Sequence, residues 1–158
     1  MRRRHLAICT LVALATFGAG SAQGAGPHRV SRAQSTLLTA INAARAANGV
    51  APLRLSASLT SAATWQSQVL ARAGYIDHTS PDGSTLVDRL ARVRWRGSAA
   101  GEDLAVASRP GDAVSMWLAS PGHRANLLSP AFRTVGLALV RGTWNGRGAF
   151  YVTADFGT

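Results

Sequence analysis

The chain has 158 residues, 47% of them hydrophobic and 15% charged, a balance that suits one folded domain and argues against intrinsic disorder. Its formal charge is +10, carried by 17 basic residues that are all arginine, which favours anionic partners such as lipid headgroups or envelope polymers. No zinc-finger spacing, RNP-like motif or basic helix indicates nucleic-acid binding, so nucleic acid is excluded as the expected partner.

The N-terminal segment predicts export. Arg2–Arg4 form a basic region, Leu6–Phe17 is an apolar run, and residues 20–22 are small, as a signal peptidase requires. The apolar run is shorter than the about 20 residues that span a bilayer. We therefore expect a signal peptide at residues 1–22 and a short flexible leader at 23–33. The mature protein is then secreted or held in the cell envelope, without a transmembrane helix.

Removal of the signal peptide takes away Cys9, the single cysteine of the chain. The exported protein is then free of disulfides, and thiol chemistry and cysteine metal sites are excluded. Its stability has to come from burial, for which one domain at residues 34–158 is long enough. The basic residues that remain outnumber the acidic ones 14 to 7. The densest basic cluster, Arg89 to Arg96, is interpreted as a solvated face.

The domain is predicted to begin with two helices. Apolar residues recur at 3.6-residue spacing over 34–48, and a glycine follows as a helix stop. A second helix is expected to start after Ser56 or Ser58, either of which can cap it, and to end before Gly74. Its many alanines indicate close packing against a neighbouring element.

A small sheet is expected to follow. The remaining elements are a loop at 75–83 with a Pro-Asp-Gly turn, a helix at 84–93, a strand at 101–107, a helix at 112–119 that ends in a turn at Pro121-Gly122, and strands at 134–140 and 149–156. Asn145-Gly146 between the last two strands is a typical hairpin turn. Helices first and an antiparallel hairpin last predict an α+β fold, with helices packed on a small sheet.

Few side chains of the predicted domain can carry chemistry. Glu102 is the single glutamate of the chain, and two histidines, His78 and His123, lie in turns beside apolar segments. A carboxylate that enters an apolar strand needs a partner, because an unpaired buried charge is costly. In the simplest interpretation an arginine, such as Arg89 or Arg124, supplies that partner.

A second interpretation brings His78, Glu102 and His123 together around one concavity. Two imidazoles, a carboxylate and a water make an open zinc or magnesium site. A hydrolytic triad with Ser80 or Ser120 is a rival hypothesis. Neither serine lies in a G-x-S-x-G elbow, so loop capping explains both better.

The turn around His123 also has a purely structural interpretation. A polar residue at the start of a helix often satisfies free backbone N–H groups. Arg124 is then expected to bridge to an Asp or Glu of a neighbouring loop, and Asn126 to close the turn. On this interpretation Arg124 is a structural anchor, not a catalyst.

Six segments carry a family resemblance: NAAR at 42–45, HTSPDG at 78–83, GEDLA at 101–105, WLASPGHRANLL at 117–128, GL at 136–137 and YVTADFG at 151–157. In this order they resemble the CAP superfamily of cysteine-rich secretory, antigen 5 and pathogenesis-related proteins, and most closely its secreted bacterial branch. The resemblance covers residues 35 to 157. It implies a three-layer α–β–α sandwich with a small, largely antiparallel sheet and a surface cavity.

The resemblance also implies the site. The cavity of many members holds two histidines and two acidic residues, and some members bind zinc or magnesium there. By motif the first histidine is His78, the first glutamate Glu102 and the second histidine His123. Ser120 stands where the second glutamate is expected, so the tetrad is incomplete. Asp103 replaces the asparagine of the family's GEN motif.

The resemblance implies structural roles for other motif residues: Asn42, Arg45, Asp103, Arg124 and Asn126. The missing fourth ligand and the lack of a recognisable nucleophile favour a binding or interaction module over an enzyme. Its ligand is expected to be a lipid, an envelope polymer or another protein, with zinc or magnesium as the candidate ion. The alternatives are a metal-dependent hydrolase with Glu102 as general base and a polar cluster that only stabilises the fold.

Overall fold

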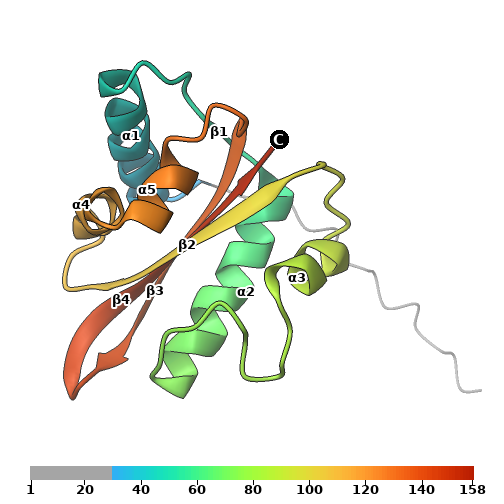
Figure 1. Cartoon of the computed structure of the whole chain (residues 1–158). Coiled ribbons are helices and arrows are strands. Elements are labelled where there is room, and N and C mark those ends of the chain that lie inside the picture. Colours follow the sequence, from blue (N-terminus) through green and yellow to red (C-terminus); the bar gives the residue numbers. More distant parts are fainter. Residues whose placement is uncertain (1–29) are drawn as a thin grey trace, which may run out of the picture.

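A computed structural model describes residues 30–158 of the chain, and the expected signal peptide lies outside the described residues. The elements are α1 Arg32–Ala47, β1 Arg54–Leu55, α2 Ala57–Ala73, α3 Leu86–Arg92, β2 Ala100–Ala107, α4 Asp112–Ala119, α5 Pro121–Leu127, β3 Thr134–Trp144 and β4 Arg147–Gly157. They form an α+β fold in which helices lie on both sides of one sheet (Figure 1). The α+β expectation is confirmed.

The sheet has the strand order β1-β3-β4-β2. β1 is parallel to β3, and β4 is antiparallel to both β3 and β2. The β3–β4 hairpin turns at Asn145 and Gly146, whose φ angles of 49° and 74° are those of a two-residue type I′ turn. The predicted turn is confirmed, but both strands continue up to it and are longer than the predicted 134–140 and 149–156.

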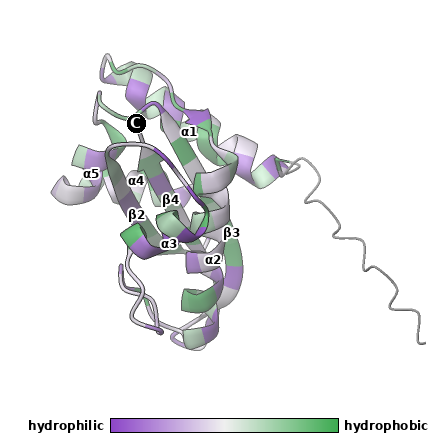
Figure 2. Cartoon of the chain, turned by 90° about the vertical axis from the view of Figure 1, so that its right-hand side faces the viewer, coloured by the Kyte–Doolittle hydropathy of each residue, from purple (hydrophilic) through white to green (hydrophobic). Residues whose placement is uncertain are grey.

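Alternate residues of the strands face two different helical layers. Val135 and Leu137 lie on the face that packs against α1, α4 and α5, where Trp117 is fully buried. The opposite face carries Leu104 and Tyr151 and packs against α2, which in turn contacts α3. Figure 2 shows apolar stretches on the sheet and on the helices around it. Burial on both faces is the main stabilising contribution.

The helix α2 approaches the sheet closely at Gly136 of β3. A Cβ atom built there would lie 2.0 Å from the backbone carbon of Leu59. Only glycine leaves room for such an approach, because real Cβ atoms do not come that near to a backbone. The alanines of α2 were expected to allow close packing against a neighbouring element. Gly136 of β3 also allows it, from the side of the sheet.

Three helix starts differ from the predictions, one of them being α3, which begins at Leu86 and not at Ser84. α1 begins at Arg32 and not at Gln34, because Ser31 and Gln34 form a reciprocal capping box. Pro121 is the first residue of α5, so the Pro-Gly dipeptide predicted to be a turn starts a helix instead. Proline suits that position, because its missing N–H would be unpaired there anyway. The extended residue between α4 and α5 is Ser120.

No helix within residues 30–158 is both long enough and apolar enough to cross a membrane.

Candidate functional site

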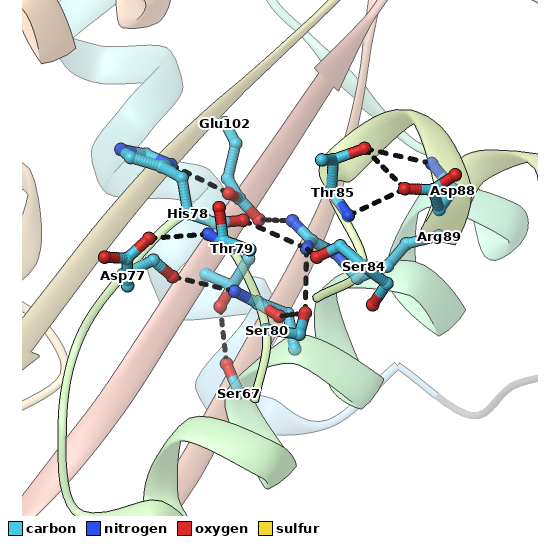
Figure 3. A network of polar contacts seen from close by, with 12 residues as sticks. Ser67, Asp77, His78, Thr79, Ser80, Ser84, Thr85, Asp88, Arg89 and Glu102 are labelled. Carbon is cyan, nitrogen blue, oxygen red and sulfur yellow. Dashed lines mark hydrogen bonds and ion pairs between the residues drawn. The ribbon is translucent and has the colours of Figure 1, made fainter. Parts of the chain in front are cut away.

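Three sequence-predicted residues meet at the outer edge of β2. His78 Nδ1 lies 2.8 Å from Glu102 Oε1, and the rings of His78 and His123 are 6.5 Å apart between centroids, tilted by 44°. His78 comes from the loop between α2 and α3, and His123 from α5. The two helical layers therefore each contribute one imidazole, and Glu102 of β2 holds the first in place (Figure 3).

Glu102 has a second partner, Arg89 of α3. The Arg89 Nη2 group is ion-paired with Glu102 Oε2, and the guanidinium is 1% exposed. Arg89 Nη1 also donates to the carbonyls of His78 and Ser84 and to the Ser80 hydroxyl. The interpretation that an arginine pairs with Glu102 is confirmed for Arg89. The same side chain fixes the loop that carries His78.

A second carboxyl group, that of Asp155, lies directly across the sheet from Glu102. The two residues are Cα partners between β2 and β4, and Asp155 is fully buried. Burial and the charge of Glu102 raise the pKa of Asp155 well above its ordinary range, although the Arg89 charge opposes the shift. The raised pKa favours the protonated form of Asp155, which reduces the negative charge that Arg89 has to neutralise.

Asp103 lies on the opposite face of β2 from Glu102. Its Oδ1 accepts a hydrogen bond of 2.9 Å from Asn126 Nδ2, and the same amide donates to the Glu102 carbonyl. Asn126 thus ties α5 to β2, whereas the sequence predicted that it would close its own turn. Burial raises the pKa of Asp103 to about 7, because a charged carboxylate is poorly solvated there.

This shift predicts how Asp103 affects stability. Because its pKa is about 7 in the folded protein and about 4 when unfolded, the folded state binds the proton more tightly. Its contribution to the free energy of unfolding therefore falls as the pH rises from about 4 to about 7. Asp103→Asn removes the ionisation and keeps an acceptor for Asn126. We expect the free energy of unfolding of the variant to exceed that of the parent by roughly 1–3 kcal/mol at pH 8.

Urea unfolding of both proteins at pH 8 and near pH 4 measures this difference. At the lower pH the advantage of Asp103→Asn should largely disappear, because Asp103 is then protonated in the folded protein and about half protonated in the unfolded chain. An equal difference at both pH values would show that ionisation of Asp103 does not limit stability.

The two imidazoles differ in basicity. The hydrogen bond from His78 to Glu102 raises the pKa of His78, in spite of partial burial. Burial, and secondarily the charge of His78, lowers the pKa of His123. His78 is thus the more readily protonated ring, and His123 the less readily protonated one. Together they place a more basic imidazole beside a less basic one.

Neither serine of the rival triad is placed as a nucleophile. The Ser80 hydroxyl donates to Gln66 Oε1 at 2.6 Å and accepts from Arg89. Ser120 caps the junction of α4 and α5 without a side-chain cap hydrogen bond. Among the described residues no hydroxyl group is hydrogen-bonded to an imidazole of His78 or His123.

The remaining motif residues hold loops to the core. Asn42 exchanges hydrogen bonds with both backbone groups of Leu53. Arg45 is fully buried and donates to four backbone carbonyls from residues 51 to 132. Arg124 donates to the Asn48 amide oxygen at 3.0 Å, so the prediction of a carboxylate partner was wrong. An exposed arginine accepts an amide oxygen as readily as a carboxylate, because both are hydrogen-bond acceptors.

Sequence reasoning missed Asp155, although the signal was present. Asp155 stands in the apolar strand YVTADFG, and a carboxylate in such a strand needs a partner for the same reason as Glu102. It also missed Gln66, which is fully buried and joins Ser80 to the carbonyl of Asp77. Nothing in the helical pattern of α2 distinguishes Gln66 from an exposed polar residue.

The described geometry does not fit a closed metal centre. Within residues 30–158 no three His, Cys, Asp or Glu side chains are arranged to hold an ion. Glu102 already uses one oxygen for His78 and the other for Arg89. Two imidazoles on one tetrahedral zinc place their ring centroids about 5 Å apart, closer than the 6.5 Å between His78 and His123.

Comparison with known proteins agrees with this fold. The model of the cysteine-rich secretory protein family, CAP, matches residues 38–156. The uncharacterized protein YkwD of Bacillus subtilis is 31% identical over 115 residues, which are 72% of this chain. An extracellular protein of Bacillus anthracis that contains an SCP domain is 28% identical, with a TM-score of 0.64 over 78% of this chain.

An outer surface protein of Borrelia burgdorferi has a TM-score of 0.73 and 22% identity, and the match covers 82% of this chain and 95% of that one. At this identity the likeness concerns the fold alone. The chain spans 45% of the length of YkwD and 39% of the Bacillus anthracis protein. What the rest of those longer proteins does is not represented in the matched domain.

Proposed function

The chain belongs to the cysteine-rich secretory protein (CAP) family, and from that premise we propose that it is an extracellular binding module without turnover. The observation that carries the proposal is the state of Glu102. Both of its oxygens are engaged, one by His78 and one by Arg89. A carboxylate whose two oxygens are both engaged in this way orients an imidazole, and its basicity toward a substrate or water is reduced by the ion pair.

The imidazole pair indicates the ligand chemistry. His78 Nδ1 faces Glu102, which directs the other ring nitrogen away from the carboxylate, and the His78 side chain is 59% exposed. A protonated His78 beside a neutral His123 suits an anionic headgroup, since charge-assisted hydrogen bonds from an imidazolium are strong. The seven acidic residues of the chain are outnumbered by arginines, which steers anionic ligands toward the surface. Phosphate of a lipid or of an envelope polymer has this chemistry.

Binding of anionic vesicles tests the proposal. We expect the protein to sediment with phosphatidylglycerol vesicles at pH 6 and to bind at least about tenfold more weakly after His78→Ala, because the charge-assisted bond is lost. Binding should weaken as the pH rises through the raised pKa of His78, since the imidazolium loses its proton. Arg92→Ala is the control, because Arg92 is an exposed cation paired with Asp82.

Equal binding by the parent and His78→Ala would contradict an imidazole site and leave only general attraction to positive charge. Competition by inorganic phosphate distinguishes a phosphate site from recognition of the whole lipid. Turnover of an ester or peptide that His78→Ala abolishes would replace the binding module with an enzyme.

The metal-dependent hydrolase remains the alternative, favoured by the two imidazoles that face each other across the edge of β2. Zinc would be held by His78 and His123 after a shift of their rings, and would supply an activated water. We expect calorimetric titration to detect no zinc binding at micromolar concentration. Stoichiometric binding that His78→Ala and His123→Ala both abolish would support the alternative.

Export completes the proposal. The basic and apolar N-terminal residues 1–22 direct secretion, in agreement with the extracellular relative from Bacillus anthracis. N-terminal sequencing of the protein recovered from culture medium should begin at Gln23. Recovery of the uncleaved chain in the membrane fraction would contradict release.

A further inference from the structure

The two edges of the sheet differ in how far other elements cover them. On the β2 side, helix side chains occupy the outward carbonyls of the strand. Asn126 Nδ2 donates to the Glu102 carbonyl at 3.3 Å, and Trp117 Nε1 donates to the Leu104 carbonyl at 3.0 Å. A sheet edge is a template for pairing with another chain unless it is covered. This edge is covered by α4 and α5.

The other edge is that of β3, and among residues 30–158 most of it has no paired strand. β1 pairs with β3 at its first two residues, where the Ser56 N–H donates to the Val135 carbonyl. Gln34 Nε2 then donates to the Leu137 carbonyl at 2.8 Å. Further along, no strand among residues 30–158 pairs with this side of β3. Backbone groups alternate in direction along a strand, so those of Leu139 and Arg141 also point outward.

The open edge lies in a slot between the two helical layers. The slot has a volume of about 200 Å³ and is lined by residues at the start of α1, by one residue of α2 and by the strand: Ser31, Ala33, Gln34, Thr64, Ala138, Leu139 and Val140. In Figure 2, β3 runs along one margin of the molecule with α1 above and α2 below. An extended chain that entered the slot would meet the edge of β3 along its floor.

The elements around the slot carry positive charge alone. All seven acidic residues lie at positions 77 to 112 and at 155, outside α1, α2 and β3. The same three elements carry the exposed arginines Arg32, Arg72 and Arg141. The guanidinium of Arg141 lies 5.0 Å from the Phe150 ring centroid, which holds it on the face of the sheet that packs against α1.

We propose that the edge of β3 from Ala138 to Thr143 binds an extended acidic peptide as an added strand. The outward backbone groups of Leu139 and Arg141 provide the main-chain hydrogen bonds of strand addition. Alternate side chains of the peptide face the two helical layers, and acidic ones on the α1 side meet Arg141. Symmetric pairing with a second copy would bring equal charges together, which is unfavourable across a sheet.

The test uses a short capped peptide in which Glu and Val alternate, added to isotope-labelled protein and followed by NMR. We expect saturable amide shifts centred on residues 138–143. Arg141→Pro removes an outward N–H and leaves the bonds to β4, because proline is tolerated on a strand edge. It should weaken binding at least about tenfold. Arg141→Gln keeps the backbone donor and removes only the charge, so it should reduce the affinity for the peptide less than Arg141→Pro does. The difference in affinity between Arg141→Gln and the parent should become smaller at high salt, because salt screens the charge of Arg141.

A peptide N-methylated at alternate residues is the decisive control, because it tests the same interaction on unaltered protein. It keeps the side chains and loses the donors toward β3, so its binding should fall as much as that of Arg141→Pro. Equal binding of the methylated peptide would overturn strand addition. Equal binding of unstructured polyglutamate would replace it with general polyanion binding, and concentration-dependent dimerisation that Arg141→Pro abolishes would replace it with a second copy.

Discussion

Arg89→Met should lower the free energy of unfolding by about 3–5 kcal/mol, because it leaves a buried carboxylate without its cation. Arg89 and Glu102 are 1% and 6% exposed, and the neighbouring Asp155 adds a second buried carboxyl group. The variant also loses three hydrogen bonds that hold the loop of His78. Urea unfolding monitored by tryptophan fluorescence measures the loss.

Arg92→Met is the matched control, three residues further along α3. Its guanidinium is 53% exposed and pairs with the exposed Asp82, a type of ion pair that contributes about 1 kcal/mol or less. The double variant Arg89→Met/Glu102→Gln should recover part of the loss, because the unpaired charge is then removed as well. If Arg89→Met and Arg92→Met were equally stable, the buried ion pair would not be a main stabilising contact.

Arg45→Met should cost about 3 kcal/mol or more, because it leaves several buried carbonyl groups without a donor. Arg45 Nε donates to the Ala51 carbonyl at 2.7 Å, and its Nη1 and Nη2 donate to the carbonyls of Leu127, Ser129 and Phe132. These bonds join α1 to the segments before β1 and after α5. Thermal unfolding with a two-state fit gives the change.

Arg32→Met is the control in the same helix. Arg32 is exposed in the first turn of α1, where a cation is unfavourable to the helix dipole. We expect this variant to be within about 0.5 kcal/mol of the parent. Arg45→Lys should stay close to Arg45→Met, since a single ammonium group cannot reach carbonyls on several sides. Full stability of Arg45→Lys would show that one of the four bonds is sufficient.

The helices and the C-terminal hairpin followed from local patterns. The 3.6-residue spacing of α1 and α2, the cap at Ser56 and the turn at Asn145-Gly146 are encoded within a few residues. The two-residue strand β1 was not predicted, because a strand so short shows no alternation. It is defined by its parallel pairing with β3, which lies about eighty residues away in sequence.

The residues of the site could be predicted from the sequence better than the contacts between them. Motifs placed His78, Glu102 and His123 together, and the cost of a buried charge required an arginine. Whether that arginine was Arg89 or Arg124 depended on the packing of α3 against α2, which brings Arg89 to Glu102 and which no local pattern encodes. The pKa values that distinguish the two imidazoles have the same origin, since they arise from Glu102 and from burial.

The central position of β4 has a consequence for folding during synthesis. β4 follows all the other strands in sequence, yet it pairs with both β3 and β2 and carries Asp155. Until residues 147–157 have been made, β2 has no strand partner. The nascent chain therefore cannot complete its sheet until residues 147–157 have been made. Before then β2 remains an unpaired strand, and a chain that exposes such a strand is prone to aggregate.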